Sequence, residues 1–150
     1  MAEIRNRLPE HRWYAPTLIY PDATPPSLMP PPEQFVQFYY KTFDENRPAL
    51  GALYKDHSML TFENSPVQGA AGITEKLVAL PFEKVQHEVA SLDAQPSNEA
   101  GGILVLVAGR LLVDDEQRPM SYTQSFQLLP DGAGSYYVFN DIFRLVYAAA

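Results

Sequence analysis

The stretch Ser135–Tyr147 reads SYYVFNDIFRLVY and decides the fold class. It is aromatic and β-branched, contains neither Pro nor Gly, and follows the turn sequence PDGAG at 130–134. These features predict a β-strand that begins after a turn. Neither its odd nor its even positions are purely polar, so we expect both faces of the strand to be covered. Helices can cover one face, and a second copy of the chain is the simplest cover for the other.

Helices are predicted before this strand. Apolar residues at helical spacing (Phe35, Phe38, Tyr39 and Phe43) predict a helix that begins near Glu33, directly after three prolines. A second short helix is expected after Pro48, and a third over Ile73–Leu80, where Pro81 ends it.

The remainder of the chain reads as strands, which are predicted over 58–63, 82–93, 102–114 and 120–129 and in the final stretch. Helices first and strands after them are typical of an α+β fold. We therefore expect a strongly curved antiparallel sheet with three helices in its concavity and an open-ended pocket.

Composition narrows the class of partner. The chain has 150 residues, no Cys and a net charge of −7, all of it carried by residues 33–150. This charge disfavours nucleic acid and anionic membranes as partners and favours a basic protein surface. No apolar run approaches the ~18 residues of a membrane span. The histidines His11, His57 and His87 lack metal-ligand spacing, so neither a metal site nor a cofactor is predicted.

Residues 1–32 differ from the rest, because they hold eight of the fourteen prolines and carry no net charge. We expect this segment to be extended or disordered, and residues 33–150 to form one domain.

Two kinds of acidic residue stand out. Asp141 lies among aromatic and aliphatic neighbours, where desolvation could raise its pKa toward that of a general base. The alternative, which we favour, is a structural role at a bulge near Asn140 or in a pair with Arg144. Glu63 and the hairpin sequence DDE at 114–116 instead indicate acids at the rim of an aromatic pocket, placed to orient a basic partner.

Three stretches carry a family resemblance: FYYKTFDENRPALGALYKDHSMLTFE at 38–63, GAAGITEKLVALPFEKVQHEVASLDAQP at 69–96 and SYYVFNDIFRL at 135–145. They closely resemble the nuclear transport factor 2 family, particularly its fungal members. The resemblance implies a cone-shaped α+β fold, a homodimer packed through the outer sheet face and no enzymatic activity. It also implies a carrier that takes the GDP form of the GTPase Ran through nuclear pores and binds phenylalanine–glycine repeats of nucleoporins, in the cytoplasm, the nucleus and at the nuclear envelope.

The resemblance also implies residue roles. A phenylalanine of Ran is expected to enter the pocket while basic Ran residues pair with the rim acids Glu63, Asp114 and Glu116. Independently of the resemblance, His87 is expected at or near the dimer interface because it lies on an outer strand. The matching pocket residues are Phe62, Leu80, Val85, Leu111, Val113, Met120, Ile142 and Phe143.

One departure from the family concerns its first helix, which begins about two turns earlier and carries an aromatic residue that helps to bind nucleoporin repeats. Leu28 stands at that position here, just before three prolines. Two rival interpretations stay open: a related binding module that dimerises with an mRNA export factor, and an isomerase or dehydratase of the same fold. The enzyme interpretation needs a buried acid–base pair, for which Asp141 has no convincing second member.

Overall fold

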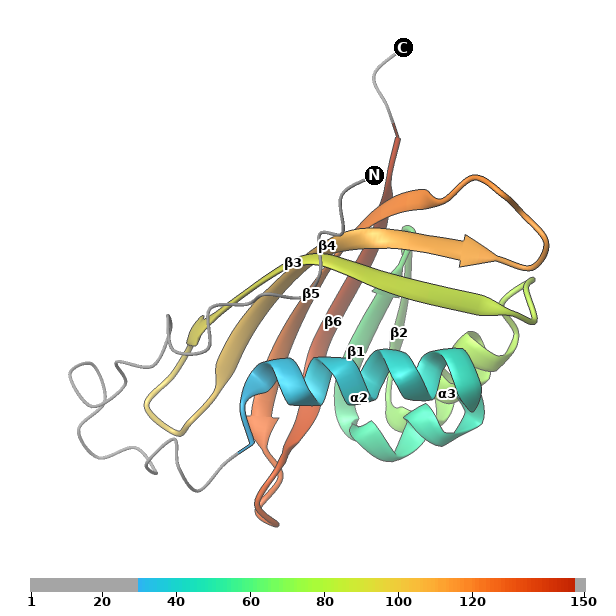
Figure 1. The fold of residues 1–150 in the computed structure, drawn as a ribbon. Coiled ribbons are helices and arrows are strands. Elements are labelled where there is room, and N and C mark those ends of the chain that lie inside the picture. The colour runs from blue at the N-terminus through green and yellow to red at the C-terminus, as the bar shows by residue number, and fades with distance from the viewer. Residues whose placement is uncertain (1–29, 148–150) are drawn as a thin grey trace.

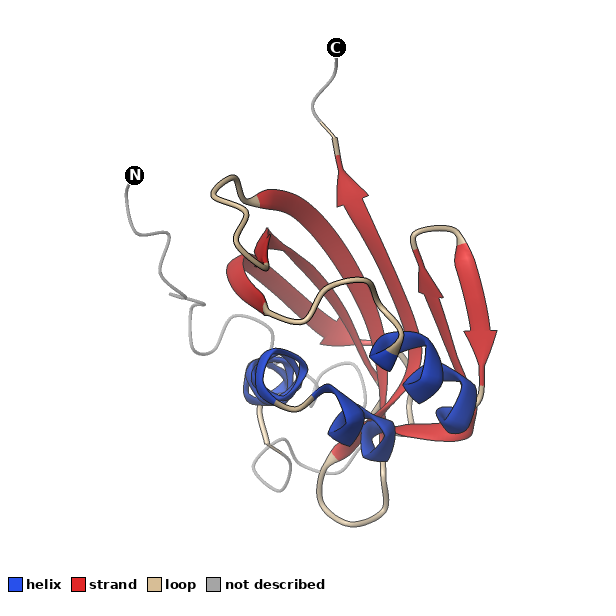
Figure 2. Cartoon of the chain, turned by 90° about the vertical axis from the view of Figure 1, so that its right-hand side faces the viewer, coloured by secondary structure: helices blue, strands red, loops and turns tan. Residues whose placement is uncertain are grey.

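The computed structural model describes residues 30–147, which form a curved sheet with helices on one face (Figure 1). Seen from the side, the helical layer lies within the curve of the sheet (Figure 2). The helical elements are α2 (Pro32–Glu45), the 3-10 helix η2 (Arg47–Leu53) and α3 (Ala70–Val78). The α+β class is therefore confirmed. No helix in the described part of the chain is long and apolar enough to cross a membrane.

Helix α2 begins where the proline run predicts. Pro32 occupies its first turn, where a missing N–H costs nothing, and Phe35, Tyr39 and Phe43 are buried against the sheet. Phe38, predicted on the same apolar stripe, is 55% exposed, and Tyr40 is buried in its place. The buried face is thus rotated from the predicted one.

The described residues form six strands: β1 (Tyr54–Phe62), β2 (Ser65–Gln68), β3 (Val85–Pro96), β4 (Ile103–Val113), β5 (Met120–Pro130) and β6 (Tyr136–Val146). Their order in the sheet is β2-β1-β6-β5-β4-β3. Strands β3 to β6 form the antiparallel meander that was predicted. The sheet is nevertheless mixed, because β1 pairs in parallel with β6, and the short strand β2 was not predicted.

Strand β4 confirms the two-faced pattern expected of the sheet. Val105 and Val107 are fully buried under the helices, whereas Leu104 and Leu106, which point the other way, are 41% and 50% exposed. The register places β6 beside the same outer surface, where Ile142 is also exposed. The outer face thus presents large aliphatic side chains that this single chain leaves uncovered.

A bulge changes the phase of β6. Gln127 pairs with Asn140 and Leu128 with Val138, so Phe139 is the extra residue. Tyr136 and Val138 face the core before the bulge, and Asp141 and Phe143 face it afterwards. The bulge expected near Asn140 is therefore present, and strict alternation does not hold along this strand.

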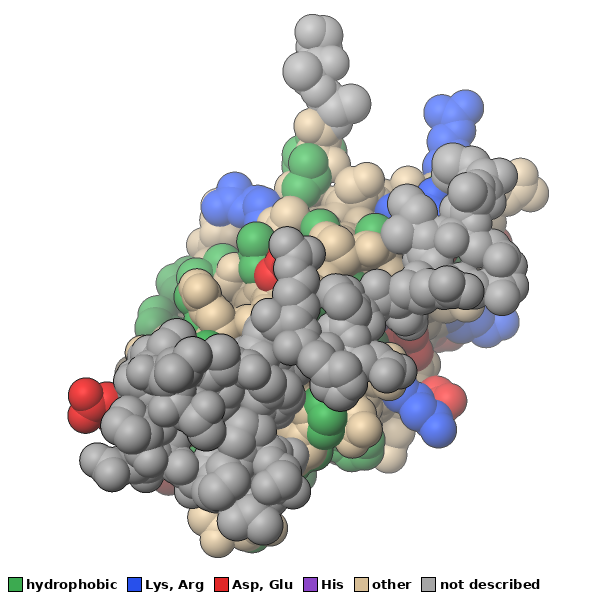
Figure 3. Space-filling view, turned by 60° about the vertical axis from the view of Figure 1, so that its left-hand side comes forward, with side chains coloured by type: hydrophobic (Ala, Val, Ile, Leu, Met, Phe, Trp, Pro, Cys, Tyr) green, Lys and Arg blue, Asp and Glu red, His purple; other side chains and the backbone are tan. Residues whose placement is uncertain are grey.

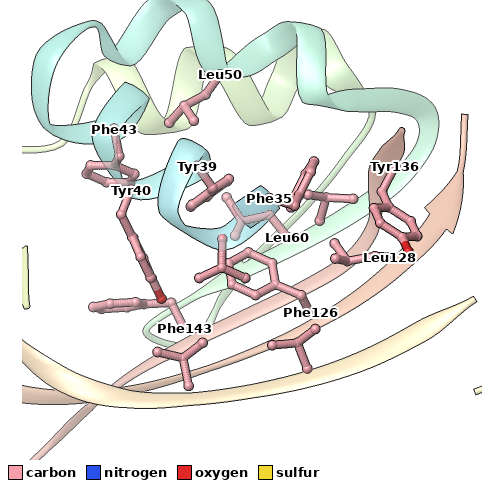
Figure 4. Packing of buried hydrophobic residues seen from close by; sticks show 14 of the residues in the cluster. Phe35, Tyr39, Tyr40, Phe43, Leu50, Leu60, Phe126, Leu128, Tyr136 and Phe143 are labelled. Carbon is pink, nitrogen blue, oxygen red and sulfur yellow. The ribbon is translucent and has the colours of Figure 1, made fainter. Parts of the chain in front are cut away.

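The core lies between α2 and the inner face of the sheet (Figure 4). The Tyr39 ring meets Phe126 edge-on with ring centroids 4.9 Å apart, and the Phe35 ring meets Tyr136 in the same manner at 6.2 Å. Edge-to-face aromatic pairs of this kind add to the stabilisation from burial. They fix the helix against the strands that form the site described next.

Candidate functional site

A row of three aromatic rings crosses the inner face of the sheet. Phe62 of β1 stacks on Phe143 of β6 with ring centroids 4.5 Å apart and planes 5° from parallel. Phe143 in turn stacks on Tyr122 of β5 at 5.4 Å. Phe143 and Tyr122 are buried, and Phe62 is half-buried, so Phe62 presents the accessible end of the row.

Other predicted pocket residues continue this inner face toward β3. The register pairs Val85 with Val113 and Leu111 with Met120. Val85 and Leu111 are buried, whereas Val113 and Met120 are half-buried, as is Leu80 between α3 and β3. The buried members support the wall from beneath, and the half-buried members form its surface.

An open hollow of about 780 Å³ lies beside the β4–β5 hairpin. At the right of Figure 1 this hairpin lies next to the loop that joins α3 to β3. Three of the predicted site residues, Val113, Asp114 and Glu116, line the hollow. Pro81 and Phe82 line it as well, although the sequence analysis did not assign them to the site.

Asp114 is held at the rim by backbone groups. Its Oδ1 accepts hydrogen bonds from the N–H groups of Glu83 at 3.0 Å and Lys84 at 3.1 Å. Its own backbone has a φ of 48°, a left-handed conformation that Asp tolerates better than most residues. These bonds fix the direction of the carboxylate before any partner arrives.

Glu63 is held in a similar way at the β1–β2 turn. Its φ is 52°, its N–H donates to the carbonyl of Phe143 at 3.1 Å, and its Oε1 accepts from the N–H of Leu145. Two of the three predicted rim acids, Glu63 and Asp114, therefore have one carboxylate oxygen engaged by the backbone. Glu116, at the exposed hairpin tip, has no such side-chain anchor within the described residues.

One predicted role is wrong, and His87, expected at or near the dimer interface, faces inward in the single chain. Ile142 cannot line the same pocket as Phe143, because neighbouring residues of a strand face opposite sides, and Ile142 is 53% exposed on the outer face. His87 pairs in register with Leu111 and faces the core, not the outer sheet face. Its ring stacks on Tyr40, and its Nδ1 lies 2.6 Å from Asp44 of α2.

Asp141 is the centre of a buried polar network. Tyr54 donates to its Oδ2 at 2.7 Å, and Gln124 donates to its Oδ1 at 2.7 Å. The Tyr39 hydroxyl lies 3.1 Å from Oδ2 and 2.7 Å from the Tyr54 hydroxyl, so its single proton can serve either acceptor. Tyr40 donates to Gln124 and extends the network.

Burial raises the pKa of Asp141 to about 6, and the bonds from Gln124 and the two tyrosines oppose that rise. Burial also raises the pKa of Tyr39 and of Tyr54 well above 10, so both hydroxyls keep their protons as donors. The raised pKa of Asp141 and a bulge near Asn140 were both anticipated, and the extra residue Phe139 directly precedes Asn140. The partners of the carboxylate were not anticipated: it bonds to Gln124 and two tyrosines instead of Arg144. The carboxylate is 1% exposed and its donors tie α2 and β1 to the sheet, which fits a structural role.

No group of three His, Cys, Asp or Glu residues in the described part of the chain is arranged to hold a metal ion. The site instead combines acids with aromatic and aliphatic side chains, an arrangement suited to a basic and apolar protein surface.

Comparison with known proteins decides the family. Residues 32–145 match the nuclear transport factor 2 (NTF2) domain. The chain belongs to the nuclear transport factor 2 family. Within that family it is similar to nuclear transport factor 2 of Emericella nidulans, with 70% identity over 117 residues that cover 78% of this chain and 94% of the relative.

Two further relatives support the assignment. Nuclear transport factor 2 of Saccharomyces cerevisiae is 58% identical over 117 residues, which cover 78% of this chain and 93% of the relative. The solved structure of nuclear transport factor 2 from Cryptosporidium parvum has a TM-score of 0.71 and 47% identity, and the match covers 76% of this chain and 90% of that one. The fold expected from the resemblance is thus confirmed.

Proposed function

We propose that this chain is a non-enzymatic carrier that binds Ran-GDP and brings it into the nucleus. Relatives of high identity named nuclear transport factor 2 support a role in nuclear transport. The finer assignment rests on the site. Glu63 and Asp114 are acids in fixed orientations, and Phe62 offers an accessible ring on the same inner face of the sheet.

The observation that carries the proposal is the backbone anchoring of both acids. A carboxylate that is already oriented loses little conformational freedom when it pairs with a cation. Each acid has a second carboxylate oxygen outside these backbone bonds, and that oxygen can accept a hydrogen bond from a Lys or Arg of the partner. The half-buried ring of Phe62 supplies an apolar contact for a phenylalanine of Ran.

We further propose that the carrier is a homodimer joined through the outer sheet face. Leu104, Leu106 and Ile142 are exposed there, around a row of small polar side chains on β5 that includes Thr123 and Ser125. Covering this face would bury more than ~2,000 Å², which is typical of an obligate dimer. Figure 3 shows one side of the single chain, where hydrophobic side chains lie among polar groups and the visible Lys and Arg side chains lie toward the edges.

We propose that nucleoporin repeats bind this chain more weakly than they bind typical family members. Leu28 takes the place of the aromatic residue expected on an earlier helical turn, and successive prolines disfavour such a turn. Residues 1–29, including Leu28, lie outside the described residues. The carrier is expected in the cytoplasm and nucleus, concentrated at the nuclear envelope.

The rival functions are less well supported. A partner of an mRNA export factor has no evident need of two anchored acids at the rim. An isomerase or dehydratase needs a carboxylate that reaches a substrate, whereas Asp141 is buried and bonded to three side chains.

Calorimetric titration of Ran-GDP into the full chain tests the proposal. Glu63→Lys should lose about 2–5 kcal/mol of binding free energy, because repulsion replaces attraction at a partly desolvated site. Glu99→Lys is the matched control, since Glu99 is exposed in the β3–β4 loop, whereas the hairpin that carries Asp114 lies at the other end of β4. Equal affinities of the two variants would contradict the acidic rim.

A further inference from the structure

The loop Ala79–Lys84 forms one wall of the hollow but has no regular secondary structure of its own. Pro81 and Phe82 of this loop line the hollow opposite the acidic β4–β5 hairpin. Backbone bonds from Ala79 to Glu75 and from Leu80 to Leu77 tie only its beginning to α3. The shape of the wall therefore depends on what holds the remainder of the loop.

Arg47 of η2 holds the loop from the helical side. Its Nη2 donates to the carbonyls of Phe82 at 2.9 Å and Glu83 at 3.3 Å, and its Nη1 donates to the carbonyl of Leu77 at 3.2 Å. The guanidinium carbon also lies 4.9 Å from the centre of the Phe82 ring. One planar fork thus joins the end of α3 to the far half of the loop.

Asp114 holds the same loop from the sheet side. Its Oδ1 accepts from the N–H groups of Glu83 and Lys84, and its own N–H donates to the carbonyl of Lys84 at 2.8 Å. Glu83 is bonded from both directions: its carbonyl accepts from Arg47 and its N–H donates to Asp114. The two side chains therefore close a clasp around Phe82-Glu83-Lys84.

We propose that Arg47 is a positioning residue for partner binding. Together with Asp114 it fixes the loop, and so determines the position of Phe82 and the orientation of the Asp114 carboxylate. This inference rests on the proposed function, because it concerns the same site. Arg47 acts through the loop, and its guanidinium is engaged by three backbone carbonyls rather than offered to a partner.

Electrostatics alone gives the opposite expectation, which makes the inference testable. Arg47 is a cation beside an acidic site that we propose binds a basic surface, so removing its charge should strengthen binding. Arg118 is the matched control, because it lines the same hollow, is exposed, and makes none of the loop contacts described above. Arg118→Met should bind Ran-GDP as well as the unaltered chain or more tightly.

The test uses Arg47→Met, Arg47→Lys and Arg118→Met in the full chain. Calorimetry should show Ran-GDP affinity about tenfold weaker in both Arg47 variants, although Arg47→Lys keeps the charge. Melting curves show whether each variant is folded. If Arg47→Met does not fold, the test relies on Arg47→Lys alone. Affinity in folded Arg47→Lys equal to that of the unaltered chain would overturn the inference.

Amide hydrogen exchange without Ran gives a second readout. The N–H groups of Glu83 and Lys84 should exchange about tenfold faster in Arg47→Lys, while that of Gly102, which donates to Asn98 at the other end of β4, should not change. Unchanged amide exchange rates at Glu83 and Lys84 would show that Arg47 does not fix the loop. If the unaltered chain fails to bind Ran-GDP, the proposed function fails, and the exchange rates still decide whether Arg47 fixes the loop.

Discussion

Replacing Asp141 by Asn should remove a specific pH dependence of stability. In the folded chain, burial raises the pKa of this carboxyl group from 3.8 to about 6. Between these two pH values the folded state keeps a proton that the unfolded state releases. The stabilisation is therefore fully present below about pH 3.8 and is lost as the pH rises through about 6.

The magnitude follows from the two pKa values. At about 1.4 kcal/mol per pKa unit, the rise corresponds to about 3 kcal/mol of unfolding free energy at neutral pH. About 2 kcal/mol of this should be lost between about pH 4.5 and pH 7. Asn has nearly the same shape and cannot ionise, so Asp141→Asn should lack this loss.

Urea denaturation followed by circular dichroism, at one fixed protein concentration, measures the effect across that pH range. The difference in unfolding free energy between Asp141→Asn and the unaltered chain should shift by about 2 kcal/mol in favour of Asn as the pH rises. Asp115→Asn, at the exposed hairpin tip, should show no such shift. A pH-independent difference for Asp141→Asn would refute the reasoning. Turnover of a small ligand that disappears in this variant would instead revive the isomerase interpretation.

Three further predictions concern the assembly and the site. Light scattering should give the mass of a dimer at micromolar concentration. Leu106→Glu should give a monomer, because it places a charge on the apolar outer face. A monomer mass for the unaltered chain would contradict the proposed dimer. Phe62→Ala should weaken Ran-GDP binding by ~2 kcal/mol or more, since it removes the accessible ring of the aromatic row. A melting curve shows whether the variant is folded. Unaltered affinity in the folded variant would mean that Ran binds at another site. Replacing residues 1–32 by a helical segment with an aromatic residue seven positions before Phe35 should strengthen binding of phenylalanine–glycine repeats and leave Ran binding unchanged. Equal repeat affinity of the two proteins would show that the N-terminal helical turns are not needed.

Much of the sheet could be predicted because it depends on local patterns. The alternation along Ile103–Val113 gave both faces of β4, and the turn sequences gave the hairpins of the meander. The parallel pairing of β1 with β6 could not be predicted, because it joins segments about 80 residues apart and leaves no local signal.

The errors at the site have physical causes. Ile142 and Phe143 are adjacent on one strand, so the alternation of side chains should have excluded one of them from the pocket. The same alternation places His87 on the face of Val85, and therefore in the core. Arg47 was not singled out, because a guanidinium that bonds to carbonyls of a distant loop leaves no motif in the sequence.

We propose that this chain carries the GDP form of Ran, and the dependence of Ran binding on the bound nucleotide is the sharpest test of this proposal. Calorimetric titration of the full chain with Ran loaded with GDP, and then with GTP, compares the two states on one surface. We predict saturable binding of Ran-GDP that is weakened by salt, because charges at the acidic rim contribute to it, and much weaker binding of Ran-GTP. Equal affinity for the two forms, or no binding of Ran-GDP, would contradict it.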